Sequence, residues 1–341
     1  MLSPSSNPSL SCLSHSDNIA RSSMNGLCLN FDNPIRDAIS RIRFAPDSNS
    51  LLISSWDSSL RLYDVDKSEL RSEAPAGGAA LLDCCFEMYD LLLGNSNDIG
   101  NHDDTATCVE YSNETCQIIT AGWDKKVKFW DARSAHSVGC LSNLAVGVES
   151  ISLSVFNLMV ALKSSVHIYD LRYLNGTVQT KEPFTNIHIK CVRSSSDIGG
   201  SVIGSTDGRV ALEYLGESNS QKDGYAFRCH PKDKDGRYHL AAVNDIAFSP
   251  SLRSVLVTGD NDGHAIIWDV QKRKRLMELP RYPNSVASMA YNHGGQLLAI
   301  ASSYTYQEAN EREELPRIFL HHMDDIHFKS APSSVCSSVR K

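Results

Sequence analysis

The chain has 341 residues, of which 41% are hydrophobic and 21% charged, enough apolar material for a sizeable core. Its formal net charge of −7 argues against a general binder of nucleic acid or of an anionic membrane surface. No apolar run approaches the roughly 18 residues that a membrane-spanning helix needs. The ten cysteines include no CxxC pair, so we expect reduced thiols and neither a metal site nor a cofactor.

The N-terminal stretch, residues 1–23, contains nine serines and almost no apolar periodicity. A Ser-rich transit peptide is disfavoured, because the stretch carries a single arginine, Arg21, and an acidic residue, Asp17. We therefore expect a disordered extension over residues 1–23, one folded domain over residues 24–328 and a flexible tail over residues 329–341.

Strand–turn–strand units fill the folded domain from one end to the other. Each unit begins with an alternating or apolar run that indicates an inner strand. The seven inner strands predicted in chain order are Ile39–Phe44, Ala80–Phe86, Thr107–Tyr111, Glu149–Ser154, Ile187–Val192, Val243–Phe248 and Ser285–Tyr291.

Several units end on an aromatic residue followed by aspartate. These closing pairs are Tyr63-Asp64, Trp130-Asp131, Tyr169-Asp170 and Trp268-Asp269, with a degenerate one near Glu213-Tyr214. From Trp130 onward the closings are about 40 to 55 residues apart. A strand, a short turn and a strand that closes on Trp-Asp, repeated at this spacing, are typical of a WD-repeat β-propeller.

The second unit is short. Its inner strand Ala80–Phe86 is followed almost at once by Tyr89-Asp90, so about 15 residues of a full repeat are missing. We therefore expect an all-β, seven-bladed WD-repeat propeller with an incomplete second blade, caused by divergence or by an aberrant transcript or gene model. The alternating stretch Leu27–Phe31 should serve as the outer strand of the last blade and so close the ring.

Polar residues around the third unit invite a catalytic interpretation. His102, Thr120, Asp124 and Trp130 occupy the places of the His–Asp–Ser/Thr–Trp tetrad of WD repeats, in which the aspartate fixes the turn and the imidazole tautomer. We favour this structural role, since such residues bind the strands of one blade together. No phosphate-cradling glycine loop, catalytic carboxylate pair or nucleophile elbow is evident, so we expect no enzyme.

A metal site near the C-terminus is the other chemical possibility. The residues that could chelate a metal are His321, His322, Asp324, Asp325 and His327. We instead predict that they form the polar end of the final blade.

Four stretches carry a closer resemblance. They are Ile53-Ser54-Ser55-Trp56-Asp57, Gly208–Leu215, Tyr225-Ala226-Phe227-Arg228-Cys229-His230 and Leu298–Tyr306. They resemble the WD-repeat mitotic spindle-checkpoint proteins of the "budding uninhibited by benzimidazoles" family, and the resemblance runs from Met24 to about His327. Departures such as Asn261 and Asp262 are similar to the divergent plant-type branch of that family.

The resemblance implies a non-enzymatic kinetochore adaptor of the spindle assembly checkpoint that supports chromosome alignment and segregation. Such adaptors bind GLEBS-type segments of checkpoint kinase-like partners and phosphorylated MELT-type repeats of the kinetochore scaffold. They lie in the nucleus, at kinetochores in mitosis, and also in the cytoplasm. We expect a monomer that binds neither nucleic acid directly nor a membrane.

Two pairs of residues match the binding sites of the family. Trp56 and Trp123 each precede an aspartate in a turn, where the matching tryptophans of the family contact the GLEBS segment. Arg209 and Arg228 match the basic residues that hold the MELT phosphothreonine. If the loop between their strands is centred near Ser218-Asn219, Arg209 lies opposite Arg228, and such a like-charge pair should repel unless an anion lies between them.

Two alternatives stay open. One is the related mRNA-export propeller, which docks on a nucleoporin and shares some of these stretches. The other is a substrate receptor of a cullin-RING ubiquitin ligase, because Trp130-Asp131-Ala132-Arg133 and Tyr169-Asp170-Leu171-Arg172 fit the WDxR pattern. Under that alternative the partners would include ubiquitin-binding or cullin-ligase adaptor proteins.

Overall fold

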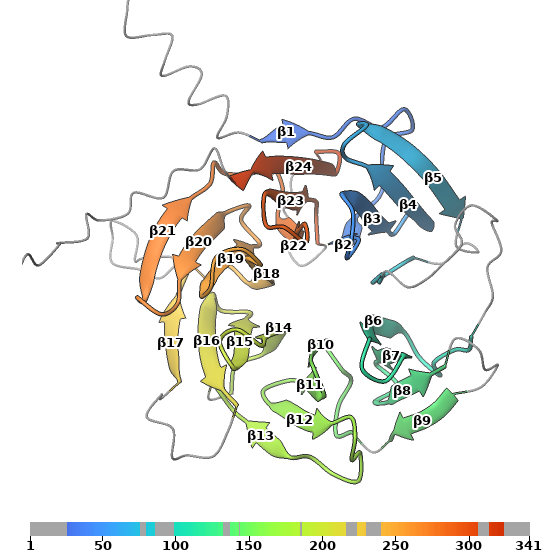
Figure 1. Cartoon of the computed structure of the whole chain (residues 1–341), viewed down its shortest axis with the longest axis vertical. Helices are drawn as coiled ribbons and strands as arrows, with labels where there is room; N and C mark the ends of the chain where they lie inside the picture. Colours follow the sequence, from blue (N-terminus) through green and yellow to red (C-terminus); the bar gives the residue numbers. More distant parts are fainter. Residues whose placement is uncertain are drawn as a thin grey trace, which may run out of the picture.

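In the computed structural model, alternating and apolar runs within the described residues form 24 β-strands, grouped into six four-stranded antiparallel sheets that follow one another around a ring (Figure 1). The structure describes residues 26–75, 80–85, 99–131, 137–142, 144–184, 186–215, 224–229, 240–305 and 314–323. Within these residues, no helix is long and apolar enough to cross a membrane.

The strands in chain order are β1 (Leu27–Cys28), β2 (Ile39–Phe44), β3 (Ser50–Ser55), β4 (Ser59–Asp64), β5 (Glu69–Pro75), β6 (Ala106–Ser112), β7 (Gln117–Gly122), β8 (Val127–Trp130), β9 (Ser137–Leu141), β10 (Ser150–Ser154), β11 (Asn157–Ala161), β12 (Val166–Asp170), β13 (Gln179–Lys181), β14 (Ile189–Ser195), β15 (Gly200–Ser205), β16 (Arg209–Tyr214), β17 (Tyr225–Arg228), β18 (Val243–Phe248), β19 (Val255–Asp260), β20 (Ala265–Asp269), β21 (Lys274–Glu278), β22 (Val286–Tyr291), β23 (Leu297–Ser302) and β24 (Arg317–His322).

Five sheets are built from four consecutive strands each, and the sixth combines both ends of the described chain. In that sheet β1 pairs antiparallel with β24, so that Leu27 lies opposite Leu320 and Cys28 opposite Phe319. The amide of Leu29 extends the pairing by donating to the carbonyl of Ile318 at 2.8 Å. The predicted closure of the ring is confirmed, although the strand is shorter than the expected Leu27–Phe31.

The prediction of seven blades with an incomplete second one is wrong, because the described residues form six four-stranded sheets. The segment 80–85, predicted as an inner strand, has no strand conformation, and Phe86 lies outside the described residues. The segment lies between β2 and β6, where Leu81 donates to the carbonyl of Ser55 at 3.3 Å. The carboxylate of Asp83 accepts from Arg41 Nε at 2.9 Å and from the Val109 amide at 3.1 Å. An apolar, strand-prone run becomes a strand only where a neighbouring strand supplies a ladder, and here a side chain makes the link instead.

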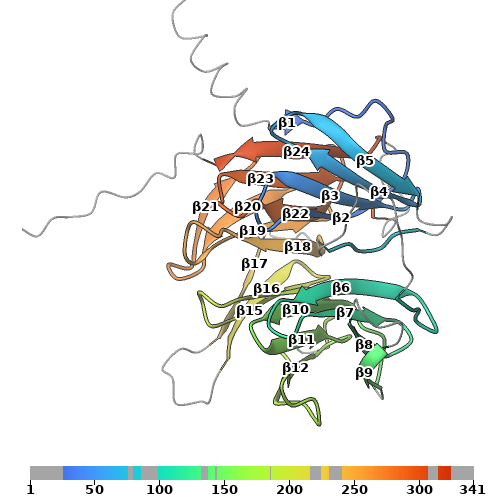
Figure 2. The ribbon, with the colours of Figure 1, turned by 45° about the vertical axis from the view of Figure 1, so that its right-hand side comes forward.

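Burial follows the position of a strand within its sheet. The second strands β3, β15, β19 and β23 are buried along their whole length. The outer strand β5 alternates between exposed and half-buried residues. The cores lie between adjacent sheets, as where Val257 and Ile267 of one sheet pack with Val286 and Ile300 of the next. Figure 2 shows the sheets in the same order around the ring from a second direction.

The turn between the second and third strands repeats in four sheets. Its aspartates are Asp57, Asp124, Asp207 and Asp262. The residue after each aspartate has a positive φ, and these residues are Ser58 (63°), Lys125 (61°), Gly208 (81°) and Gly263 (82°). Aspartate favours such turns because its carboxylate binds nearby backbone amides, as Asp57 Oδ1 does with the Ser59 amide at 3.2 Å. The repeat therefore places one carboxylate at the same end of each of these four sheets.

Candidate functional site

The structure brings the four residues of the predicted tetrad together. Trp130 Nε1 donates to Thr120 Oγ1 at 2.7 Å, and Thr120 Oγ1 lies 2.7 Å from His102 Nε2. His102 Nδ1 lies 2.9 Å from both carboxylate oxygens of Asp124. If Nδ1 donates to the carboxylate, Nε2 accepts from the Thr120 hydroxyl, and one continuous chain of hydrogen bonds results. Burial alone would raise the pKa of Asp124, but the bond from His102 and two backbone amides hold it below its ordinary value.

A second sheet repeats half of this arrangement. Trp268 Nε1 of β20 donates to Thr258 Oγ1 of β19 at 2.9 Å. Sequence reasoning missed this pair, yet a signal was present: Thr258 precedes Trp268 by the same number of residues as Thr120 precedes Trp130. These threonines therefore join the second and third strands of their sheets.

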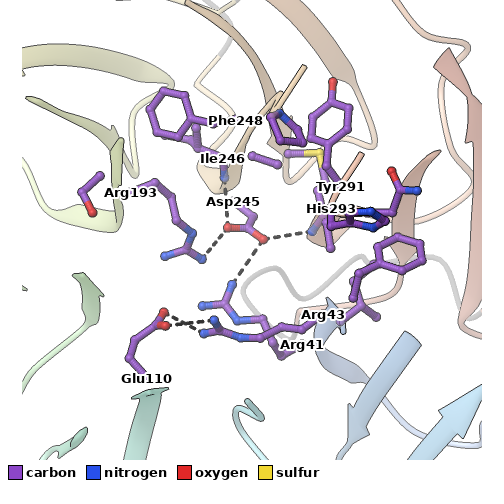
Figure 3. Close-up of a pocket in the computed structure, with 17 residues that line it drawn as sticks. Arg41, Arg43, Glu110, Arg193, Asp245, Ile246, Phe248, Tyr291 and His293 are labelled. Atoms are coloured by element: carbon purple, nitrogen blue, oxygen red, sulfur yellow. Dashed lines mark hydrogen bonds and ion pairs between the residues drawn. The ribbon is translucent and has the colours of Figure 1, made fainter. Parts of the chain in front are cut away.

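The centre of the ring holds a network of buried ion pairs, drawn in Figure 3. Asp245 of β18 accepts from Arg193 Nη2 of β14 at 2.5 Å and from Arg41 Nη1 of β2 at 3.2 Å. Arg43 donates to both oxygens of Glu110 of β6 at 3.0 and 2.8 Å. The network lines a cavity of about 370 Å³. Sequence reasoning missed it, although charged residues inside otherwise apolar inner strands were a signal.

The environment of Asp245 keeps it ionised. Burial alone would raise its pKa, but Arg193, Arg41 and the backbone amides of Met289 and Ile246 hold the pKa below its ordinary value. Its side chain is 1% exposed. The carboxylate therefore ties its own strand to the inner strands of three other sheets.

The two predicted peptide-binding tryptophans lie in equivalent turns. Trp56 is half-buried in the turn between β3 and β4, and its amide donates to the carbonyl of Ala38 at 2.9 Å. Trp123 is 52% exposed in the turn between β7 and β8. A Cβ atom placed on Gly147 would lie 3.0 Å from the Trp123 ring, so the ring lies directly against that backbone. Both tryptophans therefore lie at the same end of their sheets.

The two predicted phosphate-binding arginines lie opposite each other. Arg209 of β16 and Arg228 of β17 are direct partners in the antiparallel ladder, in the register predicted from the sequence. An internal anion lies between them, because Asp207 Oδ2 accepts from Arg209 Nε at 2.8 Å and from Arg228 Nη2 at 3.3 Å. Burial alone would raise the pKa of Asp207, but Ser205, Arg209 and Arg228 hold it below its ordinary value. Sequence reasoning missed this contact of Asp207 with the two arginines.

Beside this arginine pair, β17 and the neighbouring sheet enclose a cavity of about 320 Å³. Its aromatic lining includes Phe227 and Trp268, whose ring centroids are 4.7 Å apart. Tyr225 donates through its hydroxyl to the carbonyl of Val270 at 2.6 Å, and the Arg273 guanidinium lies 4.2 Å from the centroid of the Tyr225 ring. Arg228 also lines this cavity, so the cavity adjoins the arginine pair.

The residues proposed as possible metal ligands do not form a visible site. His321 is buried and shares a 2.6 Å hydrogen bond with the Tyr282 hydroxyl, whereas His322 is exposed. Asp324, Asp325 and His327 lie outside the described residues. Across the part of the chain that the structure describes, no group of three or more histidine, cysteine or acidic side chains could hold a metal ion.

The structure describes only one of the two arginines of the WDxR pattern, Arg172. Arg172 donates through Nε and Nη2 to the carboxylate of Asp170 at 2.9 and 2.7 Å. Its guanidinium lies 4.7 Å from the centroid of the Phe156 ring. Arg133 lies outside the described residues.

The six sheets, their aromatic–aspartate closings and the tetrad define a WD-repeat β-propeller. The family "WD domain, G-beta repeat" matches residues 27–64, 96–131 and 236–269. The chain is 46% identical over 315 residues to mitotic checkpoint protein BUB3.3 of Arabidopsis thaliana, covering 88% of this chain and 100% of that protein. It is 38% identical over 324 residues to mitotic checkpoint protein BUB3.1 of the same plant, covering 88% and 94%. The chain therefore belongs to the BUB3 family of mitotic checkpoint proteins, as the sequence resemblance predicted.

The mRNA-export relative is more distant. The chain is 26% identical over 338 residues to the poly(A)+ RNA export protein of Schizosaccharomyces pombe, covering 88% of this chain and 91% of that protein. The higher identity to the checkpoint proteins places the chain on the checkpoint side of this pair of related propellers.

Proposed function

We propose that this chain is a non-enzymatic, monomeric adaptor of the spindle assembly checkpoint, located in the nucleus and cytoplasm and at kinetochores in mitosis. It binds GLEBS-type segments of checkpoint kinase-like partners and phosphorylated MELT-type repeats of the kinetochore scaffold. The observation that carries the proposal is the Arg209–Arg228 pair, two cationic side chains on adjacent strands of a protein from a checkpoint family. Phosphate groups are bound preferentially by such paired guanidinium groups.

The phosphopeptide site is tested by removing one arginine at a time. A hydrogen bond to a charged group contributes about 1.5–3 kcal/mol, so Arg209→Ala or Arg228→Ala should weaken phosphopeptide binding roughly tenfold to a hundredfold. Titration calorimetry with a phosphorylated MELT peptide and its unphosphorylated form measures the preference. Arg172→Ala, which removes a surface arginine from another sheet, should bind as wild type does. Mutants that still discriminate between the peptides would place the phosphate site elsewhere.

The GLEBS site is tested at the two turn tryptophans. Large aromatic side chains at an interface can each contribute about 2 kcal/mol or more, so the double variant Trp56→Ala with Trp123→Ala should abolish binding of a GLEBS peptide. Tyr173→Ala, which removes an aromatic side chain that is 70% exposed on another sheet, is the matched control. Unchanged affinity in the double variant, with a melting temperature like that of wild type, would refute the assignment.

Partner choice is tested in cells. A pull-down of the tagged full chain from mitotic cells should recover a checkpoint kinase-like protein. Recovery of a cullin-ligase adaptor in its place would instead support the WDxR alternative at Arg172.

A further inference from the structure

The cavity of about 320 Å³ beside β17 has an aromatic surface, and neither Trp56 nor Trp123 lines it. Phe227 lies against Trp268 and also stacks with Tyr225, whose ring centroid is 5.9 Å away. All three rings are half-buried, so part of each remains accessible. A concave, largely apolar site of this size is typical of places where a protein takes up a ligand or one large side chain.

Two cations at this cavity have no acidic partner among the described residues. Arg273 and Lys274 both line the cavity and are exposed, and the Arg273 guanidinium lies 4.2 Å from the centroid of the Tyr225 ring. The carboxylate in the lining, Asp269, is bound by Lys272, whose amide and Nζ donate to it at 2.9 and 3.0 Å. Asp269 and Lys272 form one neutral pair, which leaves two positive charges in excess.

The turn that carries Arg273 does not require an arginine. Arg273 lies between the third and fourth strands of its sheet and has a φ of 52°. The same turn of the first sheet has Ser68 at the equivalent place, with a φ of 54°. Left-handed backbone favours glycine and small polar residues over long side chains. The fold therefore does not need a cationic side chain at this position.

The outer edge of β17 can accept a further strand. β17 is the last strand of its sheet, and among the described strands it pairs only with β16. An extended peptide can add to such an edge through main-chain hydrogen bonds, while its alternate side chains enter neighbouring pockets. A peptide added here would bring side chains to the cavity that β17 lines.

We propose that this cavity is a second docking site, for an extended acidic segment of a partner protein. One aromatic side chain of the segment packs against Phe227 and Trp268, because aromatic rings gain from tilted and stacked contacts. Carboxylates of the segment bind Arg273 and Lys274, since a guanidinium that lies over a ring can still donate through its N–H edge. This site goes beyond the proposed function, because it needs no phosphate and does not use Arg209.

The first test uses a blocked peptide of one phenylalanine flanked on each side by two aspartates. The indole N–H signals of the tryptophans in the full chain are followed by NMR while the peptide is added. The signal of Trp268 should shift until it saturates, and those of Trp56 and Trp123 should not. A peptide with alanine for the phenylalanine, and one with lysines for the aspartates, should each bind about tenfold or more weakly.

The second test removes the two cations. Arg273→Ser copies the residue of the equivalent turn, so Arg273→Ser combined with Lys274→Gln should fold as wild type does. Exposed ion pairs are individually weak, so affinity should fall roughly threefold to thirtyfold, and added salt should weaken binding to wild type more than to the variant. Lys163→Gln removes an exposed lysine between β11 and β12 and is the matched control. Binding to this control and to Arg209→Ala should equal that to wild type.

Several results would overturn the inference. They are the absence of a saturable shift at Trp268, binding of the alanine or lysine peptide within about twofold of the original, and unchanged affinity in the double variant. Loss of binding in Arg209→Ala would place the peptide at the phosphothreonine site instead. A single-stranded oligonucleotide that displaces the peptide and binds more tightly would assign the cavity to nucleic acid. If phosphopeptide binding fails while the Trp268 response is intact, the proposed function falls and this docking site stands.

Discussion

The buried carboxylate of Asp245 offers a direct test of what holds the ring together. Asp245→Asn preserves the size of the side chain but leaves the Arg41 and Arg193 guanidinium groups without their shared counter-ion. Removing one partner of a buried ion pair costs about 3–5 kcal/mol, because the remaining charge is uncompensated. Besides the two arginines, the Ser288 hydroxyl at 3.1 Å and the Met289 amide at 2.9 Å also bind this carboxylate. Arg41 keeps its ion pair with Asp83, so we expect a loss within that range and not above it.

The assay is urea unfolding, in which the dependence of unfolding free energy on urea concentration is fitted separately for each protein. Asp245→Asn should lose about 3–5 kcal/mol at pH 7, equivalent to a drop in melting temperature of roughly 5–10 °C for a chain of this size. Because the folded-state pKa of Asp245 is lowered, its contribution is present above the unfolded pKa near 4 and is lost as pH falls through the folded value. Wild type should therefore lose more stability than the variant when pH is lowered below about 4.

Two further variants show whether the charge is responsible. Glu110→Gln weakens the more exposed pair with Arg43 and should cost less, about 1.5–3 kcal/mol. Adding Arg193→Met to Asp245→Asn removes one uncompensated charge and should restore part of the lost stability. A loss below about 1 kcal/mol for Asp245→Asn would refute the reasoning, as would a double variant less stable than the single one.

Two other predictions concern single hydrogen-bonded groups. Thr120→Val leaves the Trp130 indole and His102 Nε2 without their shared partner, so urea unfolding should show that the free energy of unfolding falls by about 2–4 kcal/mol. Thr120→Ser keeps the hydroxyl and should lose far less. Equal losses in the two variants would contradict the tetrad role. Burial, with a smaller effect of His322, lowers the pKa of His321 to about 4, so the unfolded state binds the proton more tightly and stability should rise with pH between about 4 and 6.5. When pH is lowered from 7 to 4.5, the free energy of unfolding of wild type should fall by roughly 2–3 kcal/mol more than that of His321→Gln. The same dependence of unfolding free energy on pH in both proteins would contradict this.

Local pattern was sufficient to predict much of the fold. The inner strand Ile39–Phe44 and the opposition of Arg209 and Arg228 followed from alternation and from the length of one hairpin, and both are observed. The prediction failed at Ala80–Phe86, because an apolar run does not show whether a neighbouring strand is present to pair with it. Asp245 could not be assigned from sequence either, since its partners Arg41 and Arg193 are distant along the chain and meet it only when the ring closes.

The sequence indicated only part of the arrangement around Asp207. The like-charge pair of arginines required an anion, and the structure supplies one from the turn of the same hairpin. The repeated aspartate in that turn was visible in the sequence. Its contact with both arginines depends on side-chain geometry that a strand pattern does not specify.

The pairing of β1 with β24 has a consequence for how the protein is made. Five of the sheets use strands that leave the ribosome one after another, so each can form while synthesis continues. The sixth cannot be completed until Leu320 has been released to meet Leu27, which was translated long before. Contacts between such distant residues form slowly. We therefore expect the nascent chain to present an unfinished sheet edge until translation is almost over, when binding by chaperones would protect it most.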